Sequence, residues 1–225
     1  VGQGMPARDD GSPTDVLDHF GFDIVTCGGG VDWQPKRGVA DVLDETDEWR
    51  VVRNGAGAVL KWWKHRSGTP EHIEFDMSSR EVWERDYRPL LVDFDPGRVG
   101  DTAAVARSLA HRREQGKWAA YGSVFIWEYM RASMGDYTMY MALATEPDWI
   151  HDFCRVYTDL YLKAAEILVA EAGPPDGVWL SEDLGYRDRL FCRPETLAEL
   201  IFPYYAEVVS FYHAHDVPVI LHSCG

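Results

Sequence analysis

The chain has 225 residues, of which 46% are apolar and 13% aromatic, as expected for a globular rather than a disordered protein. Its formal net charge is −15. A field of that sign repels nucleic acid and anionic lipid, so we expect neither as a partner. Charges or prolines interrupt every apolar run before it reaches the roughly 18 to 20 residues that a membrane-spanning helix requires.

The four cysteines lie far apart in a chain too large to need disulfide staples, and no apolar leader precedes them. We therefore expect one compact unit in a reducing cytoplasm. These cysteines are Cys27, Cys154, Cys192 and Cys224.

Residues 1–12 carry glycine, proline and charge without periodicity, which predicts an irregular lead-in. A short helical pattern at 13–21 precedes an apolar run at 22–30 that ends in three glycines, the first predicted core strand. Residues 48–63 are two β-rich runs joined by Asn-Gly-Ala-Gly, which predicts a hairpin insertion. Helical patterns follow at 79–91 and at 101–115, where Asp101 is the predicted cap.

The apolar run at 118–127 predicts a second buried strand, with a helix running on from Glu128. The longest helix is expected to begin at Thr145, because Thr145 and Asp148 form a Thr-x-x-Asp capping pattern with Pro147 in the first turn. A third strand is predicted at 177–183, a helix from Pro194, and a fourth strand at 217–223.

Strands that alternate with helices predict an α/β fold with a parallel sheet. Each predicted strand ends in a polar or glycine-rich cluster: TCGGG, WEYM, SEDLGY and HSCG. Because the carboxyl ends of parallel strands form the active face of such folds, we expect the chemistry at these four ends.

His222 and Cys224 are two residues apart at the end of the fourth strand, so an extended backbone points both side chains to the same face. Imidazole and thiolate are both ligands of zinc. The alternative is a hydrogen-bonded core histidine beside a small buried thiol.

Glu182 and Asp183 are neighbours at the end of the third strand, with Tyr186 three residues on. Because adjacent strand residues face opposite ways, one acid can point into a pocket while the other braces a loop. We take Glu182, Asp183 and Tyr186 as candidate catalytic residues, for proton donation or substrate anchoring; the alternative is a loop acid that caps the next turn.

Glu128 and Tyr129 follow the second strand and are candidate cofactor-binding residues. Alternatively, Glu128 only stabilises the positive amino-terminal end of the following helix. The chain has no Walker loop, no His-Glu-x-x-His and no Gly-x-Ser-x-Gly, so nucleotide-dependent and serine-hydrolase functions lack their usual support.

The run from Asp176 to Gly225, which contains GVWLSEDLGY and ends in VPVILHSCG, resembles the uroporphyrinogen decarboxylase superfamily. The resemblance is closest to its cobalamin-dependent methyltransferase branch. ETDEW, SGTPEHIEF and REVWERDYRPLL extend the likeness, which begins at about residue 14.

The resemblance implies a (β/α)8 barrel of which this chain supplies about the first four β/α units, as a single partial domain over 1–225. It implies zinc held by His222, Cys224 and a cysteine beyond Gly225, and a corrinoid as methyl carrier. The implied partners are a small-molecule methyl donor or acceptor and a corrinoid protein. Because an open half-barrel exposes apolar strand edges, aggregation or a homodimer is also expected.

Two further hypotheses remain open. A cofactor-free decarboxylase of the same fold is one, although the family's aspartate at the end of the first strand is replaced here by TCGGG. The other is a truncated barrel without catalytic activity that binds a partner.

Overall fold

A parallel sheet forms the centre of the computed structural model, which describes residues 16–28 and 31–224. The predicted irregular lead-in at 1–12 lies outside these described residues. The sheet has the order β1-β6-β7-β10, and all three pairings are parallel. The strands are β1 (Ile24–Thr26), β6 (Trp118–Val124), β7 (Gly177–Glu182) and β10 (Val219–Ser223), each inside a segment predicted as a strand.

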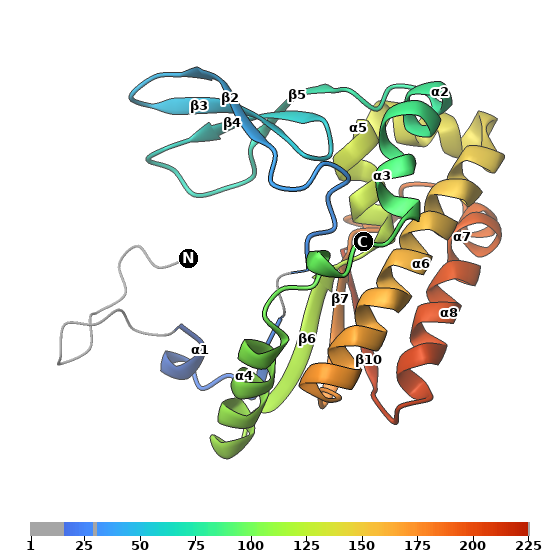
Figure 1. Ribbon diagram of the computed structural model, residues 1–225. Coiled ribbons are helices and arrows are strands. Elements are labelled where there is room, and N and C mark those ends of the chain that lie inside the picture. Colours follow the sequence, from blue (N-terminus) through green and yellow to red (C-terminus); the bar gives the residue numbers. More distant parts are fainter. Residues whose placement is uncertain (1–15, 29–30, 225) are drawn as a thin grey trace.

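The prediction of an α/β fold with a parallel sheet is therefore confirmed. The strands follow one another across the sheet in chain order, with helices packed against one face (Figure 1). Barrels share this sequential order, whereas doubly wound sheets reverse it at a switch point. The described residues form an open sheet with β1 and β10 at its edges and do not close a barrel.

The helices differ widely in length, and α6 is the longest in the described residues, with 26 residues. The α-helices are α1 (Val16–His19), α2 (Arg80–Val82), α3 (Pro89–Val92), α4 (Thr102–Glu114), α5 (Ile126–Thr145), α6 (Pro147–Ala172), α7 (Pro194–Leu200) and α8 (Phe202–His213). A π-helical turn, η1 (Trp83–Tyr87), and a 3₁₀ turn, η2 (Pro96–Arg98), lie on either side of α3.

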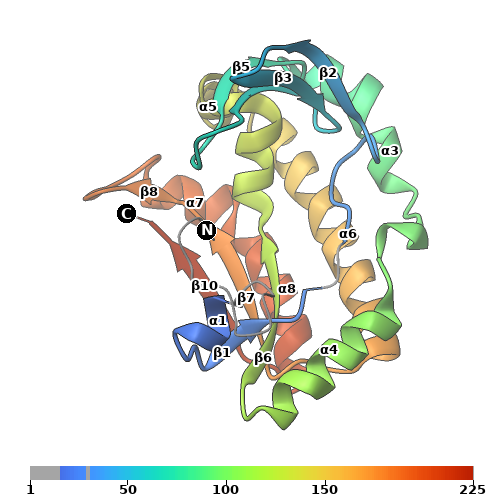
Figure 2. The ribbon, with the colours of Figure 1, turned by 90° about the vertical axis from the view of Figure 1, so that its left-hand side faces the viewer.

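A second sheet precedes most of the helices and is antiparallel, in the order β2-β3-β4-β5. Within the predicted hairpin insertion at 48–63, β3 (Trp49–Asn54) and β4 (Ala58–Trp63) pair antiparallel around the Asn-Gly-containing turn. They are flanked by β2 (Ala40–Glu45) and β5 (Glu71–Phe75), which were not predicted from the sequence. Figure 2 shows this sheet beside α5, beyond the carboxyl ends of the parallel strands.

Two predicted helix caps have different outcomes. Asp101 caps α4, since its carboxylate accepts a hydrogen bond from the Ala104 amide at 2.9 Å. Thr145 does not cap α6, because its hydroxyl donates to the Met141 carbonyl in the preceding helix, and α6 begins at Pro147 after an uncapped Glu146. The capping prediction for Thr145 was wrong because α5 runs on to that residue.

Helix α5 changes direction at Gly135, whose φ of 73° and ψ of 163° are not helical. A side chain at this position would lie 2.5 Å from the Phe75 ring of β5. The glycine thus allows the backbone of α5 to approach the antiparallel sheet closely.

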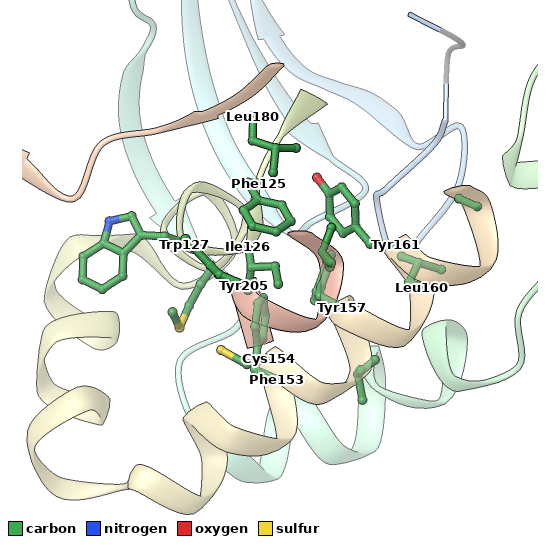
Figure 3. Packing of buried hydrophobic residues seen from close by; sticks show 14 of the residues in the cluster. Phe125, Ile126, Trp127, Phe153, Cys154, Tyr157, Leu160, Tyr161, Leu180 and Tyr205 are labelled. Carbon is green, nitrogen blue, oxygen red and sulfur yellow. The ribbon is translucent and has the colours of Figure 1, made fainter. Parts of the chain in front are cut away.

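The core lies between the parallel sheet and its covering helices (Figure 3). Aromatic residues dominate it: the Phe125 ring packs edge-on against Tyr161 at 5.0 Å, and Phe153 stacks on Tyr157 at 4.6 Å. Leu180 of β7 points into this layer and is 2% exposed. One face of the sheet is therefore sealed by helices.

The opposite face of the parallel sheet is open. Ile24, Thr26 and Trp179 line a largely apolar hollow of 550 Å³ there, together with Leu17, Phe22 and Asp23. Val124 at the end of β6 is 43% exposed, although apolar side chains at such positions are usually covered. The alternation of strand residues therefore separates a packed face from an exposed one.

Candidate metal site

The carboxyl ends of β7 and β10 bring three potential metal ligands together. β7 and β10 are paired so that His222 lies opposite Ser181 and Ser223 opposite Glu182. Strand alternation then sends His222 and Cys224 to the open face, and Asp183, one residue past β7, to the same face. Asp183, His222 and Cys224 each supply one potential ligand atom, and these three atoms all lie within 4.8 Å of one another.

The distances in this cluster suit a tetrahedral ion. His222 Nε2 lies 3.7 Å from Cys224 Sγ and 3.8 Å from Asp183 Oδ1. Ligands bound at 2.0 to 2.3 Å around tetrahedral zinc are separated by about 3.3 to 3.8 Å. Sulfur, nitrogen and carboxylate oxygen are also the three ligand types that zinc accepts, so the donor set fits this metal.

Neighbouring groups hold the three ligands in place. The Trp179 ring is stacked with the His222 imidazole, at a centroid distance of 6.3 Å and an interplanar angle of 18°. Asp183 Oδ1 accepts a hydrogen bond from the Cys224 amide at 3.1 Å, and the Ser223 hydroxyl accepts one from the Leu184 amide at 3.0 Å. The two strand ends are thus tied to each other independently of any ion.

Asp183 also sets the electrostatics of Cys224. Hydrogen bonding and charge repulsion from the Asp183 carboxylate raise the pKa of the exposed Cys224 thiol. A nearby cation reverses this balance, because it stabilises a thiolate and a carboxylate side by side. Without a cation, the protein's own groups therefore disfavour the thiolate form of Cys224.

Glu182 does not line the open face, so only one of the two adjacent acids, Asp183, belongs to the ligand cluster, as strand alternation predicts. Glu182 is 1% exposed and lies on the helix side of the sheet. Its carboxylate accepts hydrogen bonds from the Trp127 and Glu128 amides at 3.0 and 2.9 Å, and a short one from the Tyr205 hydroxyl. Alternation along β7 sends the two acids to opposite faces, so Glu182 anchors the amino-terminal end of α5.

Burial raises the pKa of Glu182 to about 8, against the opposing effect of the Tyr205 hydroxyl and the two amides. Its protonated form is therefore favoured in the folded protein over a wide range of pH. No other described acid is buried to this degree.

Glu128 lies at the first turn of α5 and forms an ion pair with Arg131 at 3.0 Å. Burial raises the pKa of Glu128, Arg131 lowers it, and Asp183 raises it again. The Asp183 carboxylate thus repels the Glu128 carboxylate, so Glu128 contributes negative charge near the candidate metal site. Its carboxylate is not a member of the ligand cluster found among the described residues.

Tyr129 and Tyr186 lie away from the ligand cluster. The Tyr129 ring stacks on Tyr157 at 5.7 Å and packs near Trp33, inside the aromatic core. Tyr186 is 62% exposed on the short hairpin formed by β8 (Gly185–Tyr186) and β9 (Arg189–Leu190). Its catalytic role, and the cofactor-binding role of Tyr129, remain predictions without geometric support.

The sequence did not predict Asp183 as a metal ligand, nor any role for Trp179 and Tyr205. The third zinc ligand was expected beyond Gly225, whereas Asp183 already supplies a third donor atom. Trp179 behind His222 and Tyr205 against Glu182 were also missed. The alternation rule could have paired Asp183 with Cys224, but only if the alignment of β7 with β10 had been known.

Taken together, the molecule is a mixed α/β protein with a candidate metal site at the carboxyl ends of two parallel strands. No protein-family model matches the chain, and no curated protein matches it. Among solved structures, the fold is similar to that of a methyltransferase from Methanosarcina mazei, with a TM-score of 0.57 and 14% sequence identity. The match covers 93% of this chain and 54% of that one, so the chain spans about half the length of the methyltransferase.

At this level of identity the likeness concerns the fold alone. The described helices include none that is both long and apolar enough to cross a membrane.

Proposed function

We propose that this chain belongs to a zinc-dependent methyltransferase or demethylase that works with a corrinoid as the other methyl carrier. The observation that carries the proposal is the meeting of Asp183, His222 and Cys224 at the carboxyl ends of parallel strands. The fold's similarity to a methyltransferase supports the reaction class, and the resemblance of the carboxyl-terminal sequence to the cobalamin-dependent branch supports the corrinoid.

In this proposal His222 Nε2, Cys224 Sγ and one oxygen of Asp183 hold the ion. When bound, zinc lowers the pKa of a coordinated thiol and presents the thiolate as a nucleophile toward a methyl group. Three protein ligands would leave a bound zinc ion accessible to a substrate, as in catalytic rather than structural zinc sites.

The chain's own residues prepare the site. Trp179 fixes the plane of the His222 ring, and Asp183 and Ser223 fix the backbone on either side of Cys224 and Leu184. Glu182 ties the end of β7 to α5, so that Glu128 stays near the ligands. These contacts reduce the reorganisation needed when a ligand binds.

Metal analysis of the purified protein tests the proposal. We expect one zinc per chain, and we expect His222→Ala and Cys224→Ala to lose it. Substitution with cobalt should produce a sulfur-to-cobalt charge-transfer band that disappears in Cys224→Ala. His215→Ala is the matched control, since His215 is an exposed histidine on the loop before β10.

Zinc retained at full stoichiometry in His222→Ala would contradict the metal assignment. Demethylation of methylcobalamin in the presence of a thiol tests the second half of the proposal. A zinc-loaded protein that gives no methyl transfer with any thiol acceptor would leave a metal site of another function, and would overturn the methyltransferase assignment.

A further inference from the structure

A second hollow lies between the carboxyl-terminal half of α5 and the segment at 191–196 that leads into α7. It has a volume of 480 Å³, which is in the range of small-molecule sites. Its walls are mixed: apolar side chains and aromatic rings alternate with groups that donate hydrogen bonds. The lining residues are Tyr140, Leu143, Ala144, Phe191, Cys192, Arg193 and Thr196.

The Tyr140 hydroxyl is buried but has no hydrogen-bond partner among the described residues. A buried donor without a partner is costly, and most such groups in native proteins are satisfied by protein, water or ligand. The Tyr140 ring stacks on Phe191 at 5.5 Å and 25°, so a fixed aromatic pair forms part of the wall of the hollow. Because the hydroxyl is fully buried, it lies behind the wall that these two rings form, out of reach of a ligand in the hollow.

The charge of the hollow is opposite to that of the whole chain. Its lining includes Arg193 and no acidic residue, although the net charge of the protein is −15. Arg193 forms no ion pair with any residue in the described ranges. Arg131, which lies over the Phe191 ring at 5.4 Å, is by contrast neutralised by Glu128 at 3.0 Å and Asp136 at 2.6 Å.

The remaining polar groups are also donors. Burial raises the pKa of the Cys192 thiol to about 11, so the thiol is protonated at neutral pH. The Thr196 hydroxyl can donate as well. An arginine, a cysteine and a threonine, all of which can donate hydrogen bonds, therefore line one space beside the apolar wall of Leu143, Ala144 and Phe191.

We propose that this hollow binds a small organic anion: a molecule with a planar apolar body against Phe191 and Leu143, and a carboxylate or similar acidic group held by Arg193. The site is separate from the ligand cluster at Asp183, His222 and Cys224 and shares no residue with it. Its occupation does not depend on zinc.

Fluorine NMR titration with 4-fluorobenzoate as the probe tests this inference, with 4-fluorobenzyl alcohol as the uncharged analogue of the same shape. We expect saturable binding of the benzoate and at least about tenfold weaker binding of the alcohol, because a hydrogen bond to a charged group is lost. Zinc addition should leave the benzoate affinity unchanged.

Three variants assign the site. Arg193→Gln should weaken benzoate binding by at least about tenfold and bring it near that of the alcohol, whereas Tyr140→Phe, which removes a hydroxyl that the ligand does not reach, should change it little. Ala144→Trp should block binding of both probes by filling the hollow from an exposed helix position. Arg189→Gln is the control and should change nothing, because Arg189 is an exposed arginine of β9, just before this segment, and does not line the hollow.

Unsaturable binding of benzoate, equal binding of benzoate and alcohol, or unchanged affinity in Arg193→Gln would each overturn the proposal. Circular dichroism of each variant separates loss of the site from loss of the fold.

Discussion

Adjacent residues at the candidate metal site have different structural roles. Glu182 and Asp183 are adjacent, yet one is buried against α5 and the other is part of the ligand cluster. Alternation along a strand is sufficient to explain this difference. For the same reason, a substitution of Glu182 should alter stability more than metal affinity, whereas a substitution of Asp183 should do the reverse.

Glu182 should make stability depend on pH. Its pKa is about 8 in the folded protein and near 4.5 without burial, so between these values the unfolded chain has released a proton that the folded chain retains. Raising the pH therefore favours unfolding, by at most about 1.4 kcal/mol per pH unit. We expect the free energy of unfolding to fall from pH 5 to pH 8 more steeply in the wild type than in Glu182→Gln, as measured by urea denaturation.

Glu199→Gln, which removes an exposed glutamate on α7, is the control and should retain the wild-type slope. Parallel slopes in the wild type and Glu182→Gln would show that Glu182 is ionised throughout this range.

Which residue caps a helix was predictable for α4 but not for α6. Asp101 accepts a bond from the Ala104 amide, so Asp101→Ala should destabilise the protein by about 0.5 to 2 kcal/mol. Thr145 bonds back to Met141 instead, so Thr145→Ala should change the stability by less than about 0.5 kcal/mol. Urea denaturation of both variants checks this difference. Equal losses would mean that Thr145 does support the start of α6.

The break in α5 should depend on a glycine. Gly135→Ala meets two obstacles, a positive φ of 73° and a contact of 2.5 Å with the Phe75 ring. Gly116→Ala meets only the first, since its φ is 71° and no atom lies within 4 Å of the added carbon. We expect Gly116→Ala to cost about 1 kcal/mol and Gly135→Ala to cost more, by about 1 to 3 kcal/mol of overpacking.

Phe75→Leu combined with Gly135→Ala should recover part of that excess, because the smaller side chain makes room. If the two glycine variants were equally stable, the approach of α5 to the antiparallel sheet would not be close enough to matter.

The elements predicted from the sequence are those whose signal is local. The four parallel strands carry apolar runs that end in polar clusters, and the turn between β3 and β4 contains Asn-Gly. β2 has no such signal: all six of its residues are exposed and it has a bulge between Val42 and Asp44, so it exists because β3 pairs with it. Likewise, His222 and Cys224 share a face by local alternation, whereas Asp183 joins them only through the alignment of two strands.

At the scale of the whole molecule, the parallel sheet is covered on one face only. The sheet order is sequential, and its outer strands β1 and β10 each pair with one neighbour among the described residues. The chain corresponds to about half of the methyltransferase that it resembles in fold. An exposed sheet face of this kind, flanked by two edge strands, is a site for further β/α units or for association with another chain.

This open face should make the 225-residue chain associate with itself in solution. Ile24 and Val124 are 39% and 43% exposed on the open face, where apolar contact and edge pairing reinforce each other. Val124→Lys places a charge on that face, at the end of β6, and should lower the association measured by sedimentation velocity and the binding of a hydrophobic dye. Tyr137→Lys removes an even more exposed apolar side chain, at 79%, from α5 and should leave the association unchanged. Association driven by this face must increase as the protein concentration rises. A wild-type chain that sediments as a monomer at all concentrations and binds no dye would therefore mean that the open face is stable in water without a further packing partner.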